Sequence, residues 1–455
     1  MSENPKPMDT IMKSAEEVEG EEEYDVLVIG GGIAGMSASL DLAEMGFKVI
    51  LVEKEPSIGG KMFLLSKVFP TLDCASCIAT PKMASTAHHP NIKVMTYSEV
   101  QEVIKEGEGD FRVKILKKPR FVEESSCTGC GQCEDACPVM VPKELDFGLR
   151  GRKAAYIPFD TAVPRVAVID LDHCIMCGQC ERVCPVGAIN FLQTPKIVKV
   201  KVGAIVITTG FELFPANLKK EYGFGEIPNV ITAMQMDRLL SPTRPFNAVL
   251  RPSDGKEPMS IAYILCAGSR DRTIGNPLCS QVCCMYSIKQ AQLIMGALPL
   301  ADITIYYMDI RAFGKGFEEF YQQAQAMGVR FVKGRVAKIE RGENDDVIVH
   351  YEDIENGGRL VKETHDLVVL SVGFLPNPEI AEIFKNEKLE LDEYGWIKPV
   401  NEDVNPVQTS IGGVFVAGCA LGPKDIPDSI VEAGAAASQC AAYLKEVREW
   451  KTREE

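Results

Sequence analysis

Two runs of cysteines in this chain have the spacing of ligands for iron–sulfur clusters. Each run follows C-x2-C-x2-C-x3-C-P, in which three thiolates bind one 4Fe-4S cluster and the fourth binds the cluster of the other run. The spacing therefore predicts two clusters; zinc knuckles are the alternative, although zinc sites use four ligands without the trailing Cys-Pro. The predicted ligands of the first cluster are Cys127, Cys130, Cys133 and Cys184. Those of the second cluster are Cys174, Cys177, Cys180 and Cys137.

A further set of cysteines follows the pattern C-x12-C-x3-C-C in the second half of the chain. The first cysteine ends an apolar segment, residues 260–265, and the last two open a predicted helix, residues 285–295. A helix N-terminus stabilises thiolate charge, and two adjacent cysteines cannot both point into a core. We expect a third 4Fe-4S cluster here, with buried or redox-active thiols as the alternative. The set is Cys266, Cys279, Cys283 and Cys284.

A glycine-rich turn near the start of the chain predicts a dinucleotide site. Residues 24–29 have the pattern of a buried strand, and the motif G-x-G-x-x-G follows them. Residues 36–46 have the apolar spacing of a helix. A second strand, residues 48–53, ends in an acidic residue. Amides at the helix N-terminus bind a pyrophosphate, and the acid binds a ribose hydroxyl. The predicted cofactor-binding residues of this unit are Gly30, Gly32, Ile33, Ala34, Gly35, Glu53 and Lys54.

Composition limits the class of protein. A length of 455 residues favours two or three domains, and no uninterrupted apolar run is long enough to cross a bilayer. The formal net charge of -15 argues against binding nucleic acid. Cysteines in cluster spacing, with no recognisable signal peptide, favour a reducing, oxygen-poor cytoplasm over secretion. Residues 1–23 are polar and end in a block of glutamates, which predicts an acidic disordered tail.

A Gly-Gly-Lys segment soon after Glu53 resembles that of flavoproteins with two dinucleotide-binding domains, such as glutathione and thioredoxin reductases. The resemblance implies FAD, with a strand-closing Thr-Gly at residues 209–210 and a second contact at residues 411–419. These enzymes usually have Asp where this chain has Cys419. Their nicotinamide domain has its own glycine turn, which is missing after residues 260–265. The implied FAD contacts are Gly60, Lys61, Gly210, Gly418 and Cys419.

The predicted fold is α/β, with two dinucleotide-binding-type domains and an inserted α+β ferredoxin domain. Residues 148–164 inside the insertion are expected to be a loop. The predicted boundaries are 24–118, 196–245 and 375–455 for the three parts of the FAD domain, 119–195 for the insertion, and 246–374 for a degenerate nucleotide-binding domain carrying the third cysteine set.

This combination resembles the A subunits of heterodisulfide reductases, and the likeness covers nearly the whole chain after Glu23. It implies an oxidoreductase component in which FAD exchanges electrons with 4Fe-4S clusters, in some members by electron bifurcation. Full-length members also carry an N-terminal cluster domain and a C-terminal ferredoxin domain, so an exit route is missing here or supplied by a separate protein. A relay component of a quinone-interacting complex and an NAD(P)H-dependent disulfide reductase are the alternatives.

The resemblance also implies partners. They are heterodisulfide reductase B- or C-like subunits, hydrogenase- or dehydrogenase-type subunits, or soluble ferredoxin, with a homodimer inside the larger complex. Cys74 and Cys77 form a C-x2-C pair on the flavin side. Three interpretations of this pair stay open. It could be half of a fourth cluster site that a partner completes, a redox disulfide, or two reduced thiols without a role.

Overall fold

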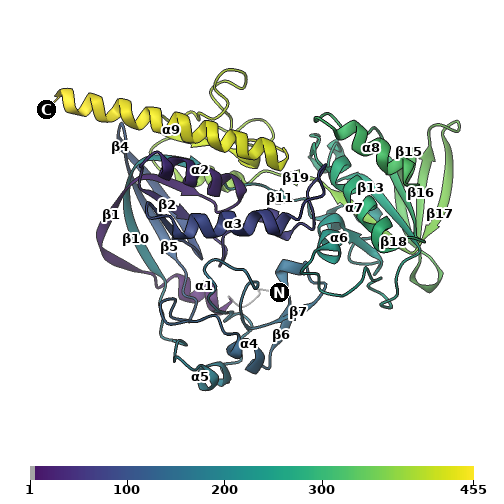
Figure 1. Ribbon diagram of the computed structural model, residues 1–455, viewed down its shortest axis with the longest axis horizontal. Helices are drawn as coiled ribbons and strands as arrows, with labels where there is room; N and C mark the ends of the chain where they lie inside the picture. Colours follow the sequence, from purple (N-terminus) through teal and green to yellow (C-terminus); the bar gives the residue numbers. More distant parts are fainter. Residues whose placement is uncertain (1–5, 455) are drawn as a thin grey trace.

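A computed structural model of the chain describes residues 6–454. Its first sheet has seven strands in the order β3-β2-β1-β10-β5-β4, with β20 paired to β10 (Figure 1). The five strands from β3 to β20 are parallel, whereas β5 and β4 are antiparallel. Buried apolar runs such as residues 26–29 favour central strands of this kind. The strands are β1 (Glu16–Ile29), β2 (Val49–Val52), β3 (Ile92–Met95), β4 (Ser98–Gly107), β5 (Asp110–Lys117), β10 (Lys196–Ile207) and β20 (Val414–Val416).

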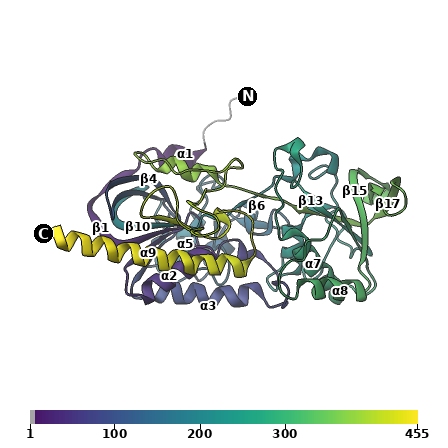
Figure 2. The same cartoon turned by 90° about the horizontal axis from the view of Figure 1, so that it is seen from above.

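Three helices cover one face of this sheet: α2 (Ile33–Glu44), α3 (Ala75–His88) and α9 (Ile426–Glu454). Seen from above, they lie together along one side of the strands (Figure 2). Small residues on α9, including Ala433 and Ala437, are fully buried and allow α9 to pack closely against α2. The other face is covered in part by η7 (Pro378–Ile383). This layering fixes the N-terminus of α2 above the ends of the parallel strands.

The second sheet also has seven strands, in the order β12-β18-β13-β14-β15-β16-β17. Helices α6 (Ala233–Leu240), α7 (Cys283–Ala297) and α8 (Phe317–Ala326) pack on it. The antiparallel pair β11 (Glu212–Leu213) and β19 (Phe374–Leu375) connects the two sheets. The predicted α/β fold is confirmed. The strands are β12 (Val230–Thr232), β13 (Ser260–Ala267), β14 (Asp302–Tyr307), β15 (Arg330–Arg341), β16 (Val347–Asp353), β17 (Arg359–His365) and β18 (Leu367–Val372).

The inserted module leaves the first sheet after β5 and returns at β10. Its small core includes three of the predicted cluster cysteines, together with residues such as Phe121 and Ile169. The predicted loop at residues 148–164 was wrong in part, because it contains β7 and β8, which pair with β6 and β9. The elements are α4 (Gln132–Ala136), β6 (Met140–Pro142), η2 (Glu144–Asp146), β7 (Gly151–Lys153), β8 (Ala155–Tyr156), β9 (Val168–Ile169) and α5 (Gln179–Val183). The other short helices are η1 (Lys61–Leu64), η3 (Ala216–Leu218), η4 (Lys220–Tyr222), η5 (Arg272–Ile274), η6 (Glu343–Asp345) and η8 (Gly418–Ala420).

The acidic segment is not a disordered tail in the part that the structure describes. Residues 16–23 are the exposed first half of β1 and pair in parallel with β10. Opposite charges on other strands of the sheet explain this order: Glu17 pairs with Lys199 of β10 at 2.5 Å, and Glu22 pairs with Lys93 of β3 at 2.7 Å. The prediction was wrong because the compensating lysines lie far away in the sequence. Residues 1–5 of the predicted tail lie outside the described range.

Helix α1 (Pro7–Met12) reaches the inserted module. Met8 and Ile11 pack against the module's core, and the Met8 amide donates a hydrogen bond to Asp172 at 3.0 Å. The N-terminal segment therefore joins the module to strand β1 of the FAD-type domain.

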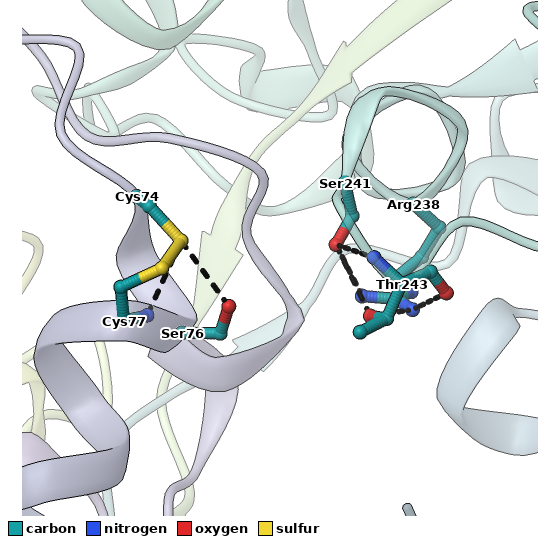
Figure 3. The surroundings of a disulfide bond; sticks show 6 residues. All are labelled: Cys74, Ser76, Cys77, Arg238, Ser241 and Thr243. Atoms are coloured by element: carbon teal, nitrogen blue, oxygen red, sulfur yellow. Dashed lines mark hydrogen bonds between the residues drawn. A yellow bond between two sulfur atoms is a disulfide. The ribbon is translucent and has the colours of Figure 1, made fainter. Parts of the chain in front are cut away.

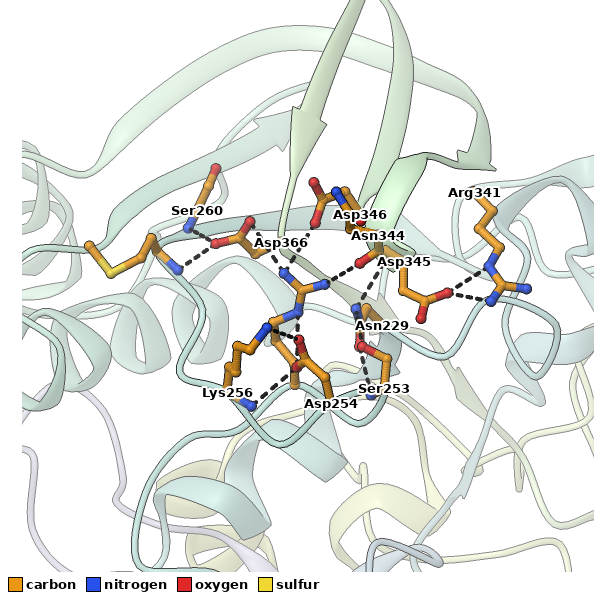
Figure 4. A network of polar contacts seen from close by, with 12 residues as sticks. Asn229, Ser253, Asp254, Lys256, Ser260, Arg341, Asn344, Asp345, Asp346 and Asp366 are labelled. Carbon is orange, nitrogen blue, oxygen red and sulfur yellow. Dashed lines mark hydrogen bonds and ion pairs between the residues drawn. The ribbon is translucent and has the colours of Figure 1, made fainter.

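A polar network closes one end of the second sheet (Figure 4). Its centre is the guanidinium of Arg251, which lies 3.1 Å from Asp346, 3.5 Å from Asp254 and 3.6 Å from Asp366. Arg251 also donates to the Asn344 carbonyl at 2.8 Å. These contacts tie the loop before β13 to the β15–β16 turn, so this acidic cluster has a structural role.

Candidate functional site

The glycines of the first turn are required by close backbone packing. Gly30 has φ +108°, and a Cβ there would lie 2.5 Å from the Thr208 carbonyl oxygen. A Cβ at Gly35 would lie 1.9 Å from the Gly30 carbonyl oxygen. Gly32 differs, because it precedes α2 with φ −75° and a Cβ there would meet no atom within 4 Å. Gly30 and Gly35 build the turn, and Gly32 leaves open space at the helix N-terminus.

Glu53 ends β2 and is fixed by backbone amides. Its carboxylate accepts hydrogen bonds from the Gly31 amide at 2.6 Å and from the Glu55 amide at 2.9 Å. Burial raises the pKa of Glu53, while these two bonds favour the charged form. The side chain is therefore positioned and oriented to accept further hydrogen bonds from a ribose.

A cleft of about 1230 Å³ extends from this turn toward the second domain. Two predicted residues do not line it: Gly35, and Gly418, where a Cβ would lie 2.9 Å from Ala34 Cβ. The cleft is long and mainly apolar, which fits a dinucleotide with a flavin ring. Predicted residues that line it are Gly30, Gly32, Ile33, Ala34, Glu53, Lys54, Gly60, Lys61, Gly210 and Cys419.

The strands that connect the two domains form one wall of the cleft. The rings of Phe211 and Phe374 stack with centroids 3.6 Å apart. Lys61 donates to the Phe211 carbonyl at 2.5 Å and lies 3.6 Å from Glu212. Burial lowers the pKa of Lys61. Lys61 thus holds the connecting strands against η1, and its cationic group stays close to the predicted flavin.

A buried ion pair that the sequence analysis missed also lines the cleft. Lys289 on α7 bonds to Asp237 on α6 at 2.6 Å, with the two side chains 1% and 2% exposed. Asp237 also accepts from Ser66 of the FAD-type domain at 2.5 Å and from Gln290 at 2.7 Å. In the sequence, the adjacent polar residues Lys289 and Gln290 within a largely apolar helix could have indicated this ion pair. The pair joins helix α7 to the first domain.

Asp237→Asn should destabilise the protein strongly, because it leaves the Lys289 ammonium buried without a counter-ion. Losing one partner of a buried pair costs about 3–5 kcal/mol. The matched control is Glu390→Gln in the exposed pair Lys398–Glu390, separated by 3.8 Å, where we expect about 0–1 kcal/mol. Urea unfolding monitored by circular dichroism measures both. Equal small shifts of the two midpoints would contradict the buried-pair prediction.

The inserted module brings cysteines of its two runs together. A hollow is lined by Cys127, Cys130 and Cys133 of the first run and by Cys184 of the second. This grouping is the one that crossed ligation requires. Burial raises the pKa of Cys133 to about 12, and the nearby thiols of Cys127 and Cys130 act in the same direction.

Three cysteines of the second predicted set lie near one another. Burial raises the pKa of Cys180, and the thiols of Cys174 and Cys137 add to the effect. Cys177 is exposed. Among residues 6–454, no group of three or more His, Cys, Asp or Glu side chains is placed to hold a single metal ion. The assignment of these cysteines to clusters stays a prediction.

The third set converges where β13 meets α7. Contact with the Cys283 thiol lowers the pKa of Cys266 to about 7 and also lowers that of Cys284. Cys283 itself is 1% exposed, and its pKa is raised by contact with both neighbours. Burial raises the pKa of Cys279, and the nearby thiols of Cys266 and Cys284 act in the same direction. The thiols of Cys266 and Cys284 thus both contact that of Cys283, and Cys279 lies nearby. Arg270 lies beside Cys266.

Tyr286 links this thiol set to the cleft. It lies on the first turn of α7, lines the cleft, and donates to the Val372 carbonyl at 3.2 Å. Burial raises the pKa of Tyr286 well above its usual value, and the thiols of Cys283 and Cys266 act in the same direction. Helix α7 therefore begins at the wall of the cleft.

Comparison with protein families supports the division seen in the structure. Residues 25–66 match the FAD binding domain family, and residues 123–188 match the 4Fe-4S dicluster domain family. Residues 263–437 match the pyridine nucleotide-disulphide oxidoreductase family. The chain thus carries an FAD-type domain, a dicluster insertion and a second domain of reductase type.

Curated relatives identify the family more closely. The iron-sulfur A subunit of the CoB--CoM heterodisulfide reductase of Methanocaldococcus jannaschii is 49% identical over 416 residues, which cover 90% of this chain and 63% of the relative. The second such A subunit of Methanopyrus kandleri is 50% identical over 438 residues, which cover 95% of this chain and 66% of the relative. Most of this chain is thus similar to heterodisulfide reductase A subunits.

Relatives in this family are longer than the chain. The A subunit of the H(2):CoB-CoM heterodisulfide,ferredoxin reductase of Methanothermobacter marburgensis is 47% identical over 419 residues, covering 91% of this chain and 63% of the relative. The chain thus spans a little under two thirds of the length of these relatives. The predicted recognition of this family is confirmed.

Solved structures agree with the fold. Thioredoxin reductases from Lactococcus lactis and T. acidophilum both align with a TM-score of 0.52 and 16% identity. They cover 93% and 94% of this chain, and each is covered over 99% of its own length. Within residues 6–454, no helix has the length and apolarity needed to span a membrane.

Proposed function

We propose that this chain is the flavin- and iron–sulfur-dependent electron-transfer subunit of a heterodisulfide reductase-type complex, and so an FAD-dependent oxidoreductase. The observation that carries the proposal is the third thiol set. It stands at the turn from β13 to α7, where a reductase of this fold would need a glycine turn for the nicotinamide nucleotide. Instead β13 enters this turn at Cys266, which has φ +57°, and α7 starts with Cys283 and Cys284.

The proposed cofactors are one FAD and three 4Fe-4S clusters. When bound, FAD supplies two-electron chemistry, and each cluster transfers one electron at a time. In this proposal Glu53 and the N-terminus of α2 orient the dinucleotide. Tyr286 and Val282 form the wall between the cleft and the third thiol set.

The inserted module is the proposed contact to partner proteins. Ile175 and Met176 lie between two predicted ligands and are 64% and 60% exposed. Exposed apolar residues at this position suit a docking partner that approaches the second cluster closely. Candidate partners are heterodisulfide reductase B- or C-like subunits, hydrogenase- or dehydrogenase-type subunits, and ferredoxin, which the name of the Methanothermobacter marburgensis relative includes.

Reduction with different donors tests the function. With anaerobically purified, cofactor-loaded protein in a stopped-flow spectrometer, we expect reduced ferredoxin to bleach the flavin absorbance rapidly. NADH should leave the absorbance unchanged on the same timescale, because the turn after β13 lacks the glycines that admit a pyrophosphate. Rapid bleaching by NADH would overturn the proposal in favour of an NAD(P)H-dependent disulfide reductase.

A second assay separates electron bifurcation from simple relay within the proposed complex. The partner proteins are added together with a low-potential and a high-potential acceptor. A bifurcating complex reduces the low-potential acceptor only when both acceptors are present. A relay, as in a quinone-interacting complex, reduces its single acceptor without the other.

A further inference from the structure

Cys74 and Cys77 form a disulfide bond at the start of α3 (Figure 3). The two sulfurs have different surroundings. Cys74 is half-buried, and its sulfur lies 3.3 Å from the Cys77 amide nitrogen and 3.4 Å from the Ser76 hydroxyl oxygen. Cys77 is exposed. The Cys74 sulfur is therefore held by hydrogen-bond donors, whereas Cys77 is the more exposed residue of the pair.

The disulfide lies at the rim of the cleft. Its chain neighbours Asp73 and Ile78 line the cleft, as does Lys67, whose backbone pairs with that of Cys74. Helix α3 packs against α2 and η1, the elements that carry the predicted pyrophosphate site and Lys61. An exposed disulfide so close to a large cleft can react with a molecule bound there.

We propose that Cys74 and Cys77 are a reversible two-electron redox couple that exchanges with a thiol or disulfide compound at the rim of the cleft. This site goes beyond the proposed transfer of single electrons through clusters and does not depend on it. It would accept a small thiol or the cysteine of a peptide, because the reacting sulfur is exposed.

The exchange follows from the asymmetry of the two sulfurs. An external thiolate attacks Cys77, the Cys74–Cys77 bond breaks, and its electron pair leaves on Cys74 as a thiolate. A second external thiol then attacks the outer sulfur of the mixed disulfide and releases Cys77. Two external thiols become one external disulfide, and their two protons end on Cys74 and Cys77. The reverse sequence reduces an external disulfide.

Cys74 is the better leaving group of the pair. A thiolate at this position accepts hydrogen bonds from the Cys77 amide and the Ser76 hydroxyl and lies at the N-terminus of α3, all of which favour the charged form. Rates of thiol–disulfide exchange rise with the stability of the leaving thiolate and with access to the attacked sulfur. Both factors select Cys77 as the point of attack.

Trapping with glutathione tests the direction of attack on full-length, anaerobically purified protein. Cys74→Ser should accumulate a mixed disulfide between glutathione and Cys77 when treated with glutathione disulfide. Cys77→Ser should accumulate much less on Cys74. Iron and flavin contents of both variants should equal those of the wild type, which shows that they fold. Equal trapping in the two variants would overturn the assigned roles.

Alkylation followed by mass spectrometry tests the couple itself. In the wild type, iodoacetamide should modify Cys74 and Cys77 only after treatment with dithiothreitol, and glutathione disulfide should restore protection. Ser76→Ala should slow reduction by dithiothreitol about threefold to tenfold, the worth of one hydrogen bond. Ser85→Ala, an exposed serine on the same helix, should not change the rate. Unprotected thiols before reduction, or a Cys77→Ser variant that loses iron, would overturn the proposal.

Discussion

Replacing Gly32 with alanine should preserve the fold and remove most of the bound FAD. The added Cβ meets no protein atom within 4 Å, and φ −75° is an ordinary value for alanine. Gly32 nevertheless lines the cleft at the N-terminus of α2, where amides must approach a pyrophosphate. Losing charge-assisted hydrogen bonds worth about 1.5–3 kcal/mol should raise the Kd for FAD about tenfold to a hundredfold.

Calorimetric titration of the flavin-free protein with FAD measures this change. The matched control is Gly296→Ala on α7, where a Cβ also meets nothing within 4 Å and the position is exposed. It should bind FAD like the wild type. Gly35→Ala is less informative, since its clash with the Gly30 carbonyl would disturb the backbone itself. An unchanged Kd for Gly32→Ala would mean that the pyrophosphate does not bind at α2.

Replacing Cys283 with alanine should lower the iron content from about twelve to about eight atoms per chain, the loss of one four-iron cluster. Cys283 is central to the third thiol set because its thiol contacts those of both Cys266 and Cys284. The clusters of the inserted module should remain, since their ligands lie in a separate core. Iron and acid-labile sulfide analysis of anaerobically purified protein gives the count.

Cys440→Ala is the matched control for this experiment. Cys440 is 0% exposed on α9, packs in the core of the first domain, and should leave the iron content unchanged. Retained FAD in both variants shows that the fold survives. If Cys283→Ala keeps all of its iron, the third set consists of buried thiols, and the proposed function loses its main support. About sixteen irons in the wild type would instead indicate a fourth cluster at Cys74 and Cys77.

Patterns confined to short stretches of sequence were predicted well. The strand, glycine turn and helix at residues 24–46 follow from short-range sterics, since Gly35 is required by contact with Gly30 five residues earlier. The paired cysteine runs predicted which thiols would meet, and Cys184 lines the same hollow as Cys127, Cys130 and Cys133, while their binding of a cluster stays a prediction. Helix α7 and strand β13 were likewise expected from their apolar spacing.

Long-range partners were not predictable from the sequence. The acidic half of β1 is ordered by Lys199 and Lys93, and Asp237 meets Lys289 and Ser66 across the two domains. Whether Cys74 bonds to Cys77 was also left open, because ligands from another chain could have completed that site. The entropy of closing a long loop changes little with its length, so separation in sequence barely restricts which distant segments pair. Spacing and local sterics thus determined the cofactor motifs, whereas packing between distant segments decided the buried charges and the ordered acidic strand.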